Sequence, residues 1–233
     1  SADACYGGLV VQGVCMFADR KEAGEALAQR LLCRADLAHA VILALPRGGV
    51  PVAAAVALTC HRPLDVLLVQ KLGYPEAPEV AMGAIGACGV RVLNDDIDLQ
   101  DANVAGRVAE VEQKERLELQ RRQRRYRPNN EVHTLTDQVV WIIDDGVATG
   151  ASMKAAVAVV QSHRPRAVVV AVPVCPPEVS VALQQCGAEV LALTVLAPFH
   201  AVGAHYRNFA QLTDDEVLFW LNRCRGSGDL SIK

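Results

Sequence analysis

The chain has 233 residues, a formal net charge of −3 and an apolar fraction of 52%. This length and composition suit one globular domain over residues 1–233, and the small net charge argues against the basic surface that nucleic acid requires. Apolar runs are short and broken by glycine, proline or charge, so we expect no membrane partner. Eight cysteines are scattered singly without a Cys-x-x-Cys pair, which is typical of a reduced, cytoplasmic protein rather than of a zinc site.

Short β-rich apolar runs alternate with helical patterns, which predicts an α/β fold with a mostly parallel, twisted sheet flanked by helices. Asp19 followed by Glu22 has the spacing of an N-cap and capping box, which marks the start of the first helix. We expect strands over residues 41–45, 66–70, 81–87, 90–93, 139–143, 167–172 and 190–195. We expect helices over residues 19–33, 50–60, 97–125, 151–163, 177–186 and 213–223.

A tight turn separates the first expected strand from the helix that follows it. The sequence over residues 41–55 is VILALPRGGVPVAAA, and the turn is formed by Arg47, Gly48 and Gly49. Such a turn exposes backbone amides beside one basic side chain, a combination that suits an anion. An ordinary turn explains the same residues, so this motif is weak evidence when it is taken alone.

The next segment, QKLGYPEAPEVAMGAIGACG over residues 70–89, is rich in glycine and proline and has little regular periodicity. We expect a loop over much of it. Lys71, at the end of the preceding strand, is a candidate anion contact, with a surface lysine as the alternative. Glu76 and Glu79 lie in the same segment, and we assign neither as a base because solvated loop acids are common.

Residues 107–130 are strongly charged and end in Pro-Asn-Asn. The arginines of this stretch could contact nucleic acid or phosphate, but a solvated helix face is the simpler explanation. We therefore expect no nucleic-acid partner. The arginines concerned are Arg121, Arg122, Arg124, Arg125 and Arg127.

The segment IIDDGVATGAS over residues 142–152 carries the strongest functional signal. An apolar strand runs into Asp144 and Asp145 at the carboxyl end of the strand, where open α/β sheets bind ligands. The turn that follows opens a helix, whose first amides and partial positive charge suit a phosphate group. The hydroxyls of a ribose 5-phosphate could donate to the two carboxylates while Mg²⁺ offsets nearby charge. The loop residues expected to bind this ligand are Gly146, Val147, Ala148, Thr149, Gly150, Ala151 and Ser152.

Near the C-terminus, LAPFHAVGAHYRNF over residues 196–209 concentrates aromatic and histidine side chains. These residues could form a small hood over a planar base, with Phe199 as the candidate stacking residue. A packing strap along the sheet edge is an equally good explanation. We expect the hood to combine N-terminal residues with about 196–212.

Together, these motifs resemble the type I phosphoribosyltransferases. IIDDGVATGAS is similar to their phosphoribosyl pyrophosphate signature, in which an apolar stretch and two acids precede a Thr-Gly-x-Ser/Thr loop. The resemblance covers about residues 17–221 and extends to a poorly characterised bacterial group that shares further motifs. In this chain those motifs are FADRKEAGEALA, LPRGGVPVA, KLGYPEAPEVAMGAI and FHAVGAHYRNF.

The resemblance implies transfer of the phosphoribosyl group from phosphoribosyl pyrophosphate to a nitrogenous base, with release of pyrophosphate and with Mg²⁺ as cofactor. Asp144 and Asp145 would hold the ribose and, mainly through ligand or water, the metal. Residues 70–89 would correspond to a mobile lid that excludes water. The residues that would contact pyrophosphate are Arg47, Gly48, Gly49 and Lys71.

Ala148 departs from the pattern of the 6-oxopurine enzymes, which usually carry an aspartate just before the Thr-Gly pair. Adenine-type enzymes also have alanine there, so the departure leaves catalysis intact but leaves the acceptor base and the proton acceptor open. A sensor or regulator that binds phosphoribosyl pyrophosphate without turnover is the alternative. A sugar-phosphate hydrolase is a weaker one, because a Gly-x-Ser-x-Gly elbow and a metal-ligand cluster are both missing. The sequence also leaves open whether the chain forms a homodimer.

Overall fold

The computed structural model describes residues 16–78, 80–127 and 134–225 of the chain. Its centre is a parallel sheet of five strands in the order β2-β1-β6-β7-β8. Parallel neighbours that are far apart in sequence require crossover connections, which the helices supply. The strands of this sheet are β1 (Val41–Ala44), β2 (Leu64–Val66), β6 (Val139–Ile143), β7 (Ala167–Cys175) and β8 (Glu189–Val195).

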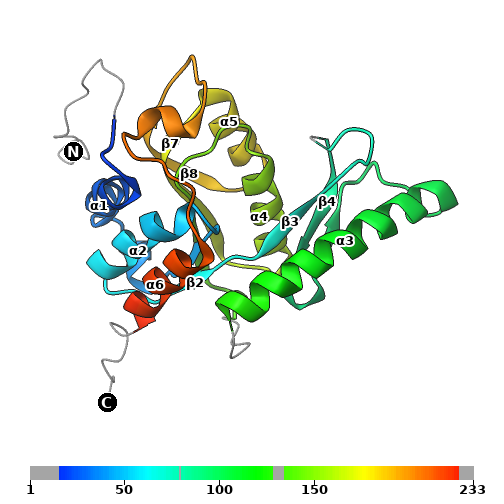
Figure 1. The fold of residues 1–233 in the computed structure, drawn as a ribbon, viewed down its shortest axis with the longest axis horizontal. Coiled ribbons are helices and arrows are strands. Elements are labelled where there is room, and N and C mark those ends of the chain that lie inside the picture. The colour runs from blue at the N-terminus through cyan, green and yellow to red at the C-terminus, as the bar shows by residue number, and fades with distance from the viewer. Residues whose placement is uncertain (1–15, 79, 128–133, 226–233) are drawn as a thin grey trace.

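Helices cover both faces of the main sheet (Figure 1). Ile42 and Trp141 pack into the core beneath α1, α2 and α6, whereas their neighbours Leu43 and Ile142 pack into the core beneath α4 and α5. Because both faces are buried, the strands read as continuous apolar runs in the sequence. The predicted α/β fold with a mostly parallel sheet is confirmed. The helices are α1 (Arg20–Leu31), α2 (Gly49–Thr59), α4 (Ala151–Ser162), α5 (Pro177–Gln185) and α6 (Asp214–Arg225).

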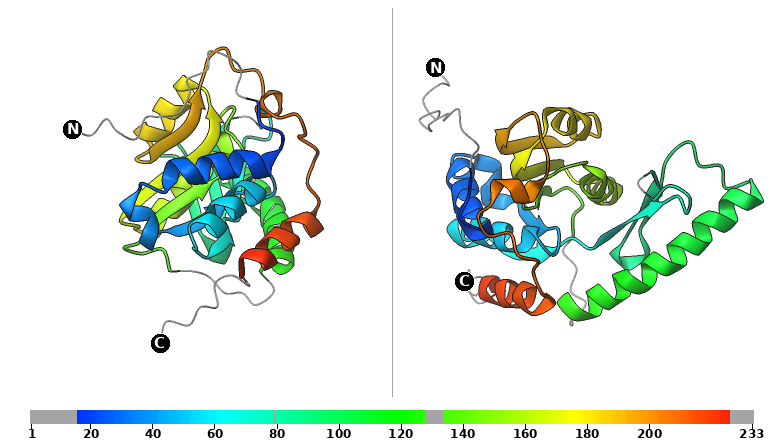
Figure 2. Two further views of the ribbon diagram at one scale, coloured as in Figure 1. Left: turned by 90° about the vertical axis from the view of Figure 1, so that its left-hand side faces the viewer. Right: turned by 45° about the horizontal axis from the view of Figure 1, so that its top comes forward.

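A second, antiparallel sheet of three strands in the order β3-β4-β5 packs against a long helix, α3. Figure 2 shows this unit extending away from the main sheet, and we call residues 69–126 the arm. The sequence did not predict a separate sheet. Its elements are β3 (Val69–Gly73), β4 (Ala81–Gly86), the short helix η2 (Ala87–Gly89), β5 (Arg91–Leu93) and α3 (Ala102–Tyr126).

The expected strand over residues 66–70 is wrong, because the chain passes from one sheet to the other within it. β2 ends at Val66, and β3 begins at Val69. Between them, Leu67 packs into the core beneath α4 and α5, whereas Leu68 packs into the core beneath α1 and α2. An unbroken apolar run does not show where the chain leaves one sheet for the other. The sequence pattern therefore predicted one strand where the structure has two.

Residues 70–89 contain most of the β3–β4 hairpin of the arm, in which Lys71 lies opposite Ala84. β4 confirms the strand expected over residues 81–87, whereas β3 stands where a loop was expected. A Cβ added at Gly83 would lie 2.2 Å from the Val92 carbonyl oxygen, and one added at Gly73 would lie 2.4 Å from the Pro78 carbonyl oxygen. Glycine is therefore required here for close backbone packing, although its frequency suggested a loop. Glu79 lies outside the described residues.

Several helix and strand boundaries differ from the predicted ones for local reasons. The N-cap at Asp19 is confirmed, since its Oδ1 accepts the Glu22 N–H at 2.9 Å. α3 begins at Ala102, because Asp101 caps it. β7 continues through Pro173 to Cys175. After Ala171 it no longer pairs with β6 and pairs only with β8, so a proline is tolerated there.

Two further short helices, η1 (Ala35–His39) and η3 (Val202–His205), complete the fold. Within the described ranges, every helix is either too short or too polar to cross a bilayer.

Candidate active site

The loops after β1 and β6 lie side by side, because these strands are parallel neighbours in the sheet. The first loop carries Arg47, Gly48 and Gly49, and the second carries Asp144 and Asp145. The Leu45 N–H donates to the Ile143 carbonyl at 3.0 Å, which continues the strand pairing up to the start of both loops. The strand order therefore brings together two motifs that are far apart in sequence.

The glycines of the first loop allow its backbone to touch the acid pair. A Cβ at Gly48 would lie 2.1 Å from Asp145 Oδ2, and a Cβ at Gly49 would lie 2.6 Å from the Ile143 carbonyl oxygen. A side chain at Gly49 would force the loops apart, and one at Gly48 would displace the Asp145 carboxylate or the loop. The Gly49 N–H already donates to the Leu45 carbonyl at 3.0 Å, and the Pro46–Arg47 peptide is cis.

The second loop is anchored on one side and open on the other. Val147 is buried, and its N–H donates to the Val174 carbonyl at 3.0 Å. Ala148 and Thr149 are exposed. Gly150 has a φ of +78°, a left-handed conformation that few residues other than glycine adopt readily. The loop therefore presents Ala148 and Thr149 to solvent while Val147 holds it to the sheet.

The first turn of α4 follows directly, and it is suited to an anion. Its N-cap is Gly150, which has no side chain to cap the helix, and the first turn carries no acid. The Thr149 hydroxyl makes only a long contact, 3.5 Å, with the Ala151 N–H. Ser152 is exposed at the same helix end. Uncapped N–H groups and two hydroxyls thus meet at one place.

The acid pair is held in an environment that disfavours two full charges. Burial, followed by the charge of Asp145, raises the pKa of Asp144 well above its ordinary value. Burial also raises the pKa of Asp145, although hydrogen bonding to Arg20 opposes the shift. The Asp145 N–H donates to Asp144 Oδ1 at 2.8 Å, which fixes the first carboxylate. Ligand hydroxyls or a cation placed here would relieve the repulsion.

Arg20 is a site residue that sequence reasoning missed. Its Nε donates to Asp145 Oδ2 at 2.7 Å, and the two side chains are only 11% and 12% exposed. The signal was present, because Arg20 lies in the shared FADRKEAG motif. Its partner lies 125 positions away in the chain, so spacing alone could not connect them.

The segment expected to form a hood packs on residues just before α1. Phe17 N–H donates to the His205 carbonyl at 2.8 Å, and the Phe17 and Tyr206 ring centroids lie 5.6 Å apart. The Tyr206 hydroxyl donates to the Asp145 carbonyl at 2.6 Å, so this segment reaches the acid pair directly. Phe199 is half-buried, with its ring centroid 5.2 Å from that of His205. Residues 1–15, part of the expected hood, lie outside the described residues.

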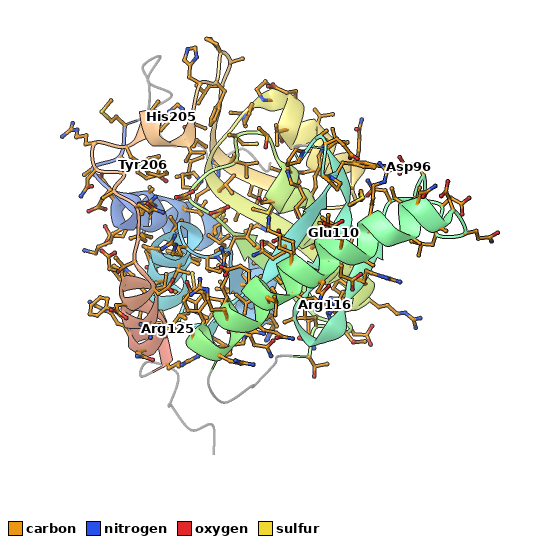
Figure 3. The ribbon with its side chains drawn as sticks, turned by 45° about the vertical axis from the view of Figure 1, so that its right-hand side comes forward. Asp96, Glu110, Arg116, Arg125, His205 and Tyr206 are labelled. Carbon is orange, nitrogen blue, oxygen red and sulfur yellow. The ribbon has the colours of Figure 1, made fainter. Side chains whose placement is uncertain are left out.

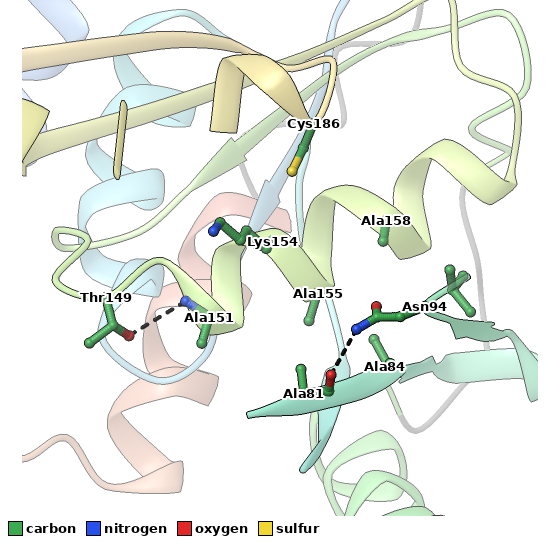
Figure 4. Close-up of a pocket in the computed structure, with 11 residues that line it drawn as sticks. Ala81, Ala84, Asn94, Thr149, Ala151, Lys154, Ala155, Ala158 and Cys186 are labelled. Carbon is green, nitrogen blue, oxygen red and sulfur yellow. Dashed lines mark hydrogen bonds between the residues drawn. The ribbon is translucent and has the colours of Figure 1, made fainter. Parts of the chain in front are cut away.

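A cavity of about 600 Å³ lies between the arm and the start of α4 (Figure 4). Thr149, Ala151 and Lys154 line it on one side, and Ala84 and Asn94 line it on the other. It therefore adjoins the loop that the sequence assigns to phosphate.

Residues 18–191 match the phosphoribosyl transferase domain family. The chain belongs to this family. Relatives from two Mycobacterium tuberculosis strains, CDC 1551 / Oshkosh and H37Rv, are named as candidate phosphoribosyl transferases. Each is 48% identical over 208 residues, which are 89% of this chain and 47% of the relative. The chain thus spans about half the length of these relatives.

The fold is also shared with a protein of known structure. A crystal structure of a Thermus thermophilus protein aligns with a TM-score of 0.80 and 42% identity, covering 89% of this chain and 98% of that one. The resemblance that the sequence motifs suggested is therefore confirmed for this phosphoribosyl transferase domain.

In the phosphoribosyl transferase domain, most of the site residues that the sequence predicted lie at one edge of the main sheet. Arg47, Gly48, the acid pair and the loop up to Ser152 all lie there. Lys71 lies elsewhere, inside β3 of the arm, and its contact with pyrophosphate stays a prediction. The predicted contact of Phe199 with a base also remains untested.

The basic residues at the end of α3 are mostly paired with acids of this domain. Arg127 is buried against Asp65, and Arg122 pairs with Glu118. Arg125, at the end of α3 beside α6 (Figure 3), pairs with Asp215. Such pairing supports the interpretation of this stretch as a solvated or packed helix face.

The carboxylate oxygens of the acid pair are suitable ligands for a magnesium ion that binds together with a phosphate ligand. Mg²⁺ prefers oxygen ligands and is usually held by one or two carboxylates together with phosphates and water. Asp144 supplies a half-buried carboxylate of this kind. Within the described part of the chain, groups of three or more metal-binding His, Cys, Asp or Glu side chains are absent, so the protein alone offers few ligands.

Proposed function

We propose that this chain transfers the phosphoribosyl group from phosphoribosyl pyrophosphate to a nitrogenous base and releases pyrophosphate. The observation that carries the proposal is the contact between Gly48 and Asp145. It places a loop with a basic residue against a loop with two acids and an uncapped helix end. A diphosphate, a pentose and a phosphate monoester would each have a matching group at this edge.

The 5-phosphate would bind at the loop before α4. Amides from Ala148 to Ser152 and the hydroxyls of Thr149 and Ser152 would surround it, because Ala148, Thr149 and Ser152 are exposed. Val147 would contribute by holding the loop to the sheet, since its own N–H is already bonded.

The ribose hydroxyls would donate to Asp144 and Asp145. A hydroxyl donor binds an ionised carboxylate strongly, and two adjacent hydroxyls match two adjacent acids. Ligand binding would then favour the ionised pair, which burial disfavours in the free protein.

Pyrophosphate would lie against the first loop. Arg47 would supply positive charge and Gly48 its backbone amide, while the absence of a side chain at Gly49 keeps the loops close. We retain Lys71 as a further contact, made if the arm approaches the main sheet. When bound with the ligand, Mg²⁺ would neutralise charge on the leaving group.

In the reaction, the bond between the anomeric carbon and the pyrophosphate oxygen breaks, and its electron pair leaves with pyrophosphate. The nitrogen of the base forms the new bond to that carbon and then loses a proton. Ala148 cannot accept this proton, so the acceptor of the proton comes from the base site or from solvent. Phe199 would stack on the base.

The proposal extends to the cellular location and the partners of the protein. Cys33 and Cys186 are exposed free thiols, which supports a reducing, cytoplasmic environment. The partners would be phosphoribosyl pyrophosphate and one class of base, and homodimer formation stays a prediction.

The experiment is an assay with phosphoribosyl pyrophosphate, Mg²⁺ and a panel of purine and pyrimidine bases, in which pyrophosphate and the ribonucleotide are both measured. We expect pyrophosphate release with one base class. Asp145→Asn should reduce the rate of this release about 100-fold or more. Asp96→Asn, an exposed acid on the arm (Figure 3), is the matched control and should retain full activity. Binding of phosphoribosyl pyrophosphate without any ribonucleotide would contradict transfer and favour a sensor.

A further inference from the structure

The Arg20 side chain connects the start of α1 to two other parts of the site. Its Nε donates to Asp145 Oδ2 at 2.7 Å, and its Nη1 donates to the Ala210 carbonyl at 2.9 Å. Its Cζ also lies 3.9 Å from the centroid of the Phe209 ring. One side chain from the start of α1 therefore contacts the acid pair and the segment expected as a hood.

These contacts use the particular shape of a guanidinium group. Two nitrogens donate to different oxygens while the flat face lies over Phe209. An ammonium could replace the charge, but not this combination of fixed donors and a stacking face. At 11% side-chain exposure, the pair with Asp145 is also poorly screened by water.

The same segment holds Asp145 from a second direction. The Tyr206 hydroxyl donates to the Asp145 carbonyl at 2.6 Å, and Tyr206 stacks on Phe209 with ring centroids 5.0 Å apart. On the opposite loop, Gly48 leaves room for Asp145 Oδ2 only because it has no side chain. Asp145 is therefore enclosed by Arg20, Tyr206 and the Gly48 loop.

We propose that Arg20 is a positioning residue, which fixes the Asp145 carboxylate against the Gly48 loop and ties its orientation to residues 206–210. The inference rests on the proposed function, in which Asp145 accepts a ribose hydroxyl. In this role Arg20 acts through Asp145 rather than on the reacting atoms. Loss of Arg20 should therefore weaken ligand binding only as long as Asp145 is present.

The first experiment measures the affinity for phosphoribosyl pyrophosphate with Mg²⁺ by calorimetry, in a double-mutant cycle. We expect Arg20→Gln to weaken binding about tenfold and Arg20→Lys to recover part of the loss. Lys21→Gln, which removes an exposed charge from the next position of α1, should stay within about twofold of the wild type. Adding Arg20→Gln to Asp145→Asn should cause no further loss.

Two results would overturn the inference. One is a folded Arg20→Gln protein that binds as the wild type does, and the other is a double variant whose loss equals the product of the two single losses. Thermal unfolding of each variant verifies that it is folded.

A second experiment separates this inference from the proposed function. Crystal structures of the ligand-free wild type and of Arg20→Gln compare the position of the Asp145 carboxylate. Movement of Asp145 Oδ2 away from Gly48 in the variant supports the positioning role, and an unchanged position contradicts it. If the wild type takes up no phosphoribosyl pyrophosphate, the proposed function fails, while these structures still decide whether Arg20 positions Asp145.

Discussion

Gly48 and Asp145 come from loops after two neighbouring strands, and a Cβ on Gly48 would lie 2.1 Å from the Asp145 Oδ2 atom. Asp145 Oδ2 also accepts from Arg20 Nε, so turning the carboxylate away from an added Cβ would break that ion pair. Any other residue at position 48 must therefore displace either the Asp145 carboxylate or the loop that carries it.

Gly48→Ala should weaken binding of phosphoribosyl pyrophosphate about tenfold or more, because the acid pair is displaced from the pyrophosphate loop. Calorimetry with Mg²⁺ present measures the effect. Gly106→Ala is the control, since a Cβ at Gly106 meets nothing within 4 Å. It lies inside α3, so this substitution should stabilise the protein by about 0.5–1 kcal/mol and leave binding unchanged. Equal affinity in Gly48→Ala and the wild type would contradict the close contact.

Asp144→Asn should make the ligand-free protein more stable at neutral pH. The pKa of Asp144 is raised by burial, so the folded state binds its proton more tightly than the unfolded state does. Between the unfolded pKa of about 3.9 and the raised value, stability therefore falls as the pH rises. The variant removes this loss, and we expect a gain of about 1 kcal/mol near pH 7.5 that disappears near pH 4.

Urea unfolding of Asp144→Asn and the wild type at both pH values measures this gain. Asn can still accept the Asp145 N–H, so the local hydrogen bond is preserved. Asp96→Asn, an exposed control, should change stability by less than about 0.5 kcal/mol at either pH. A gain for Asp144→Asn that is the same at both pH values would rule out the buried charge as its cause.

Arg127→Met should destabilise the protein by about 3–5 kcal/mol, because it leaves Asp65 buried without its cation. Arg127 Nε donates to Asp65 Oδ1 at 2.9 Å, and the two residues are 7% and 6% exposed. Arg121→Gln, which removes an exposed ion pair near the end of α3, should cost less than about 1 kcal/mol. Urea unfolding measures the stability of both variants. Similar losses of stability would show that the buried ion pair contributes no more than an exposed one.

Gly150→Ala should cost more stability than Gly89→Ala, although both glycines have left-handed φ values, +78° and +83°. The conformation alone costs about 1 kcal/mol at each position. A Cβ at Gly150 would also lie 2.7 Å from Val179 Cγ1, whereas one at Gly89 meets nothing within 4 Å. Thermal unfolding of the two variants isolates the contact with Val179, and equal losses would show that this contact relaxes freely.

Local patterns in the sequence determined the α/β class, most of the helices and strands, and the acid-and-glycine loop before α4. These features depend on neighbouring residues, such as the apolar run of β6 that ends at Asp144. Patterns of that kind are visible without knowing which segments meet in space.

Only the tertiary structure decided which distant residues share the site. The break between Val66 and Val69, the antiparallel sheet of the arm and the contact of Arg20 with Asp145 all depend on long-range partners. The amide of Val147 is another case, because only the position of Val174 shows that it is already bonded. The physical reason is that burial and hydrogen bonding depend on strand order and packing, which local periodicity does not encode.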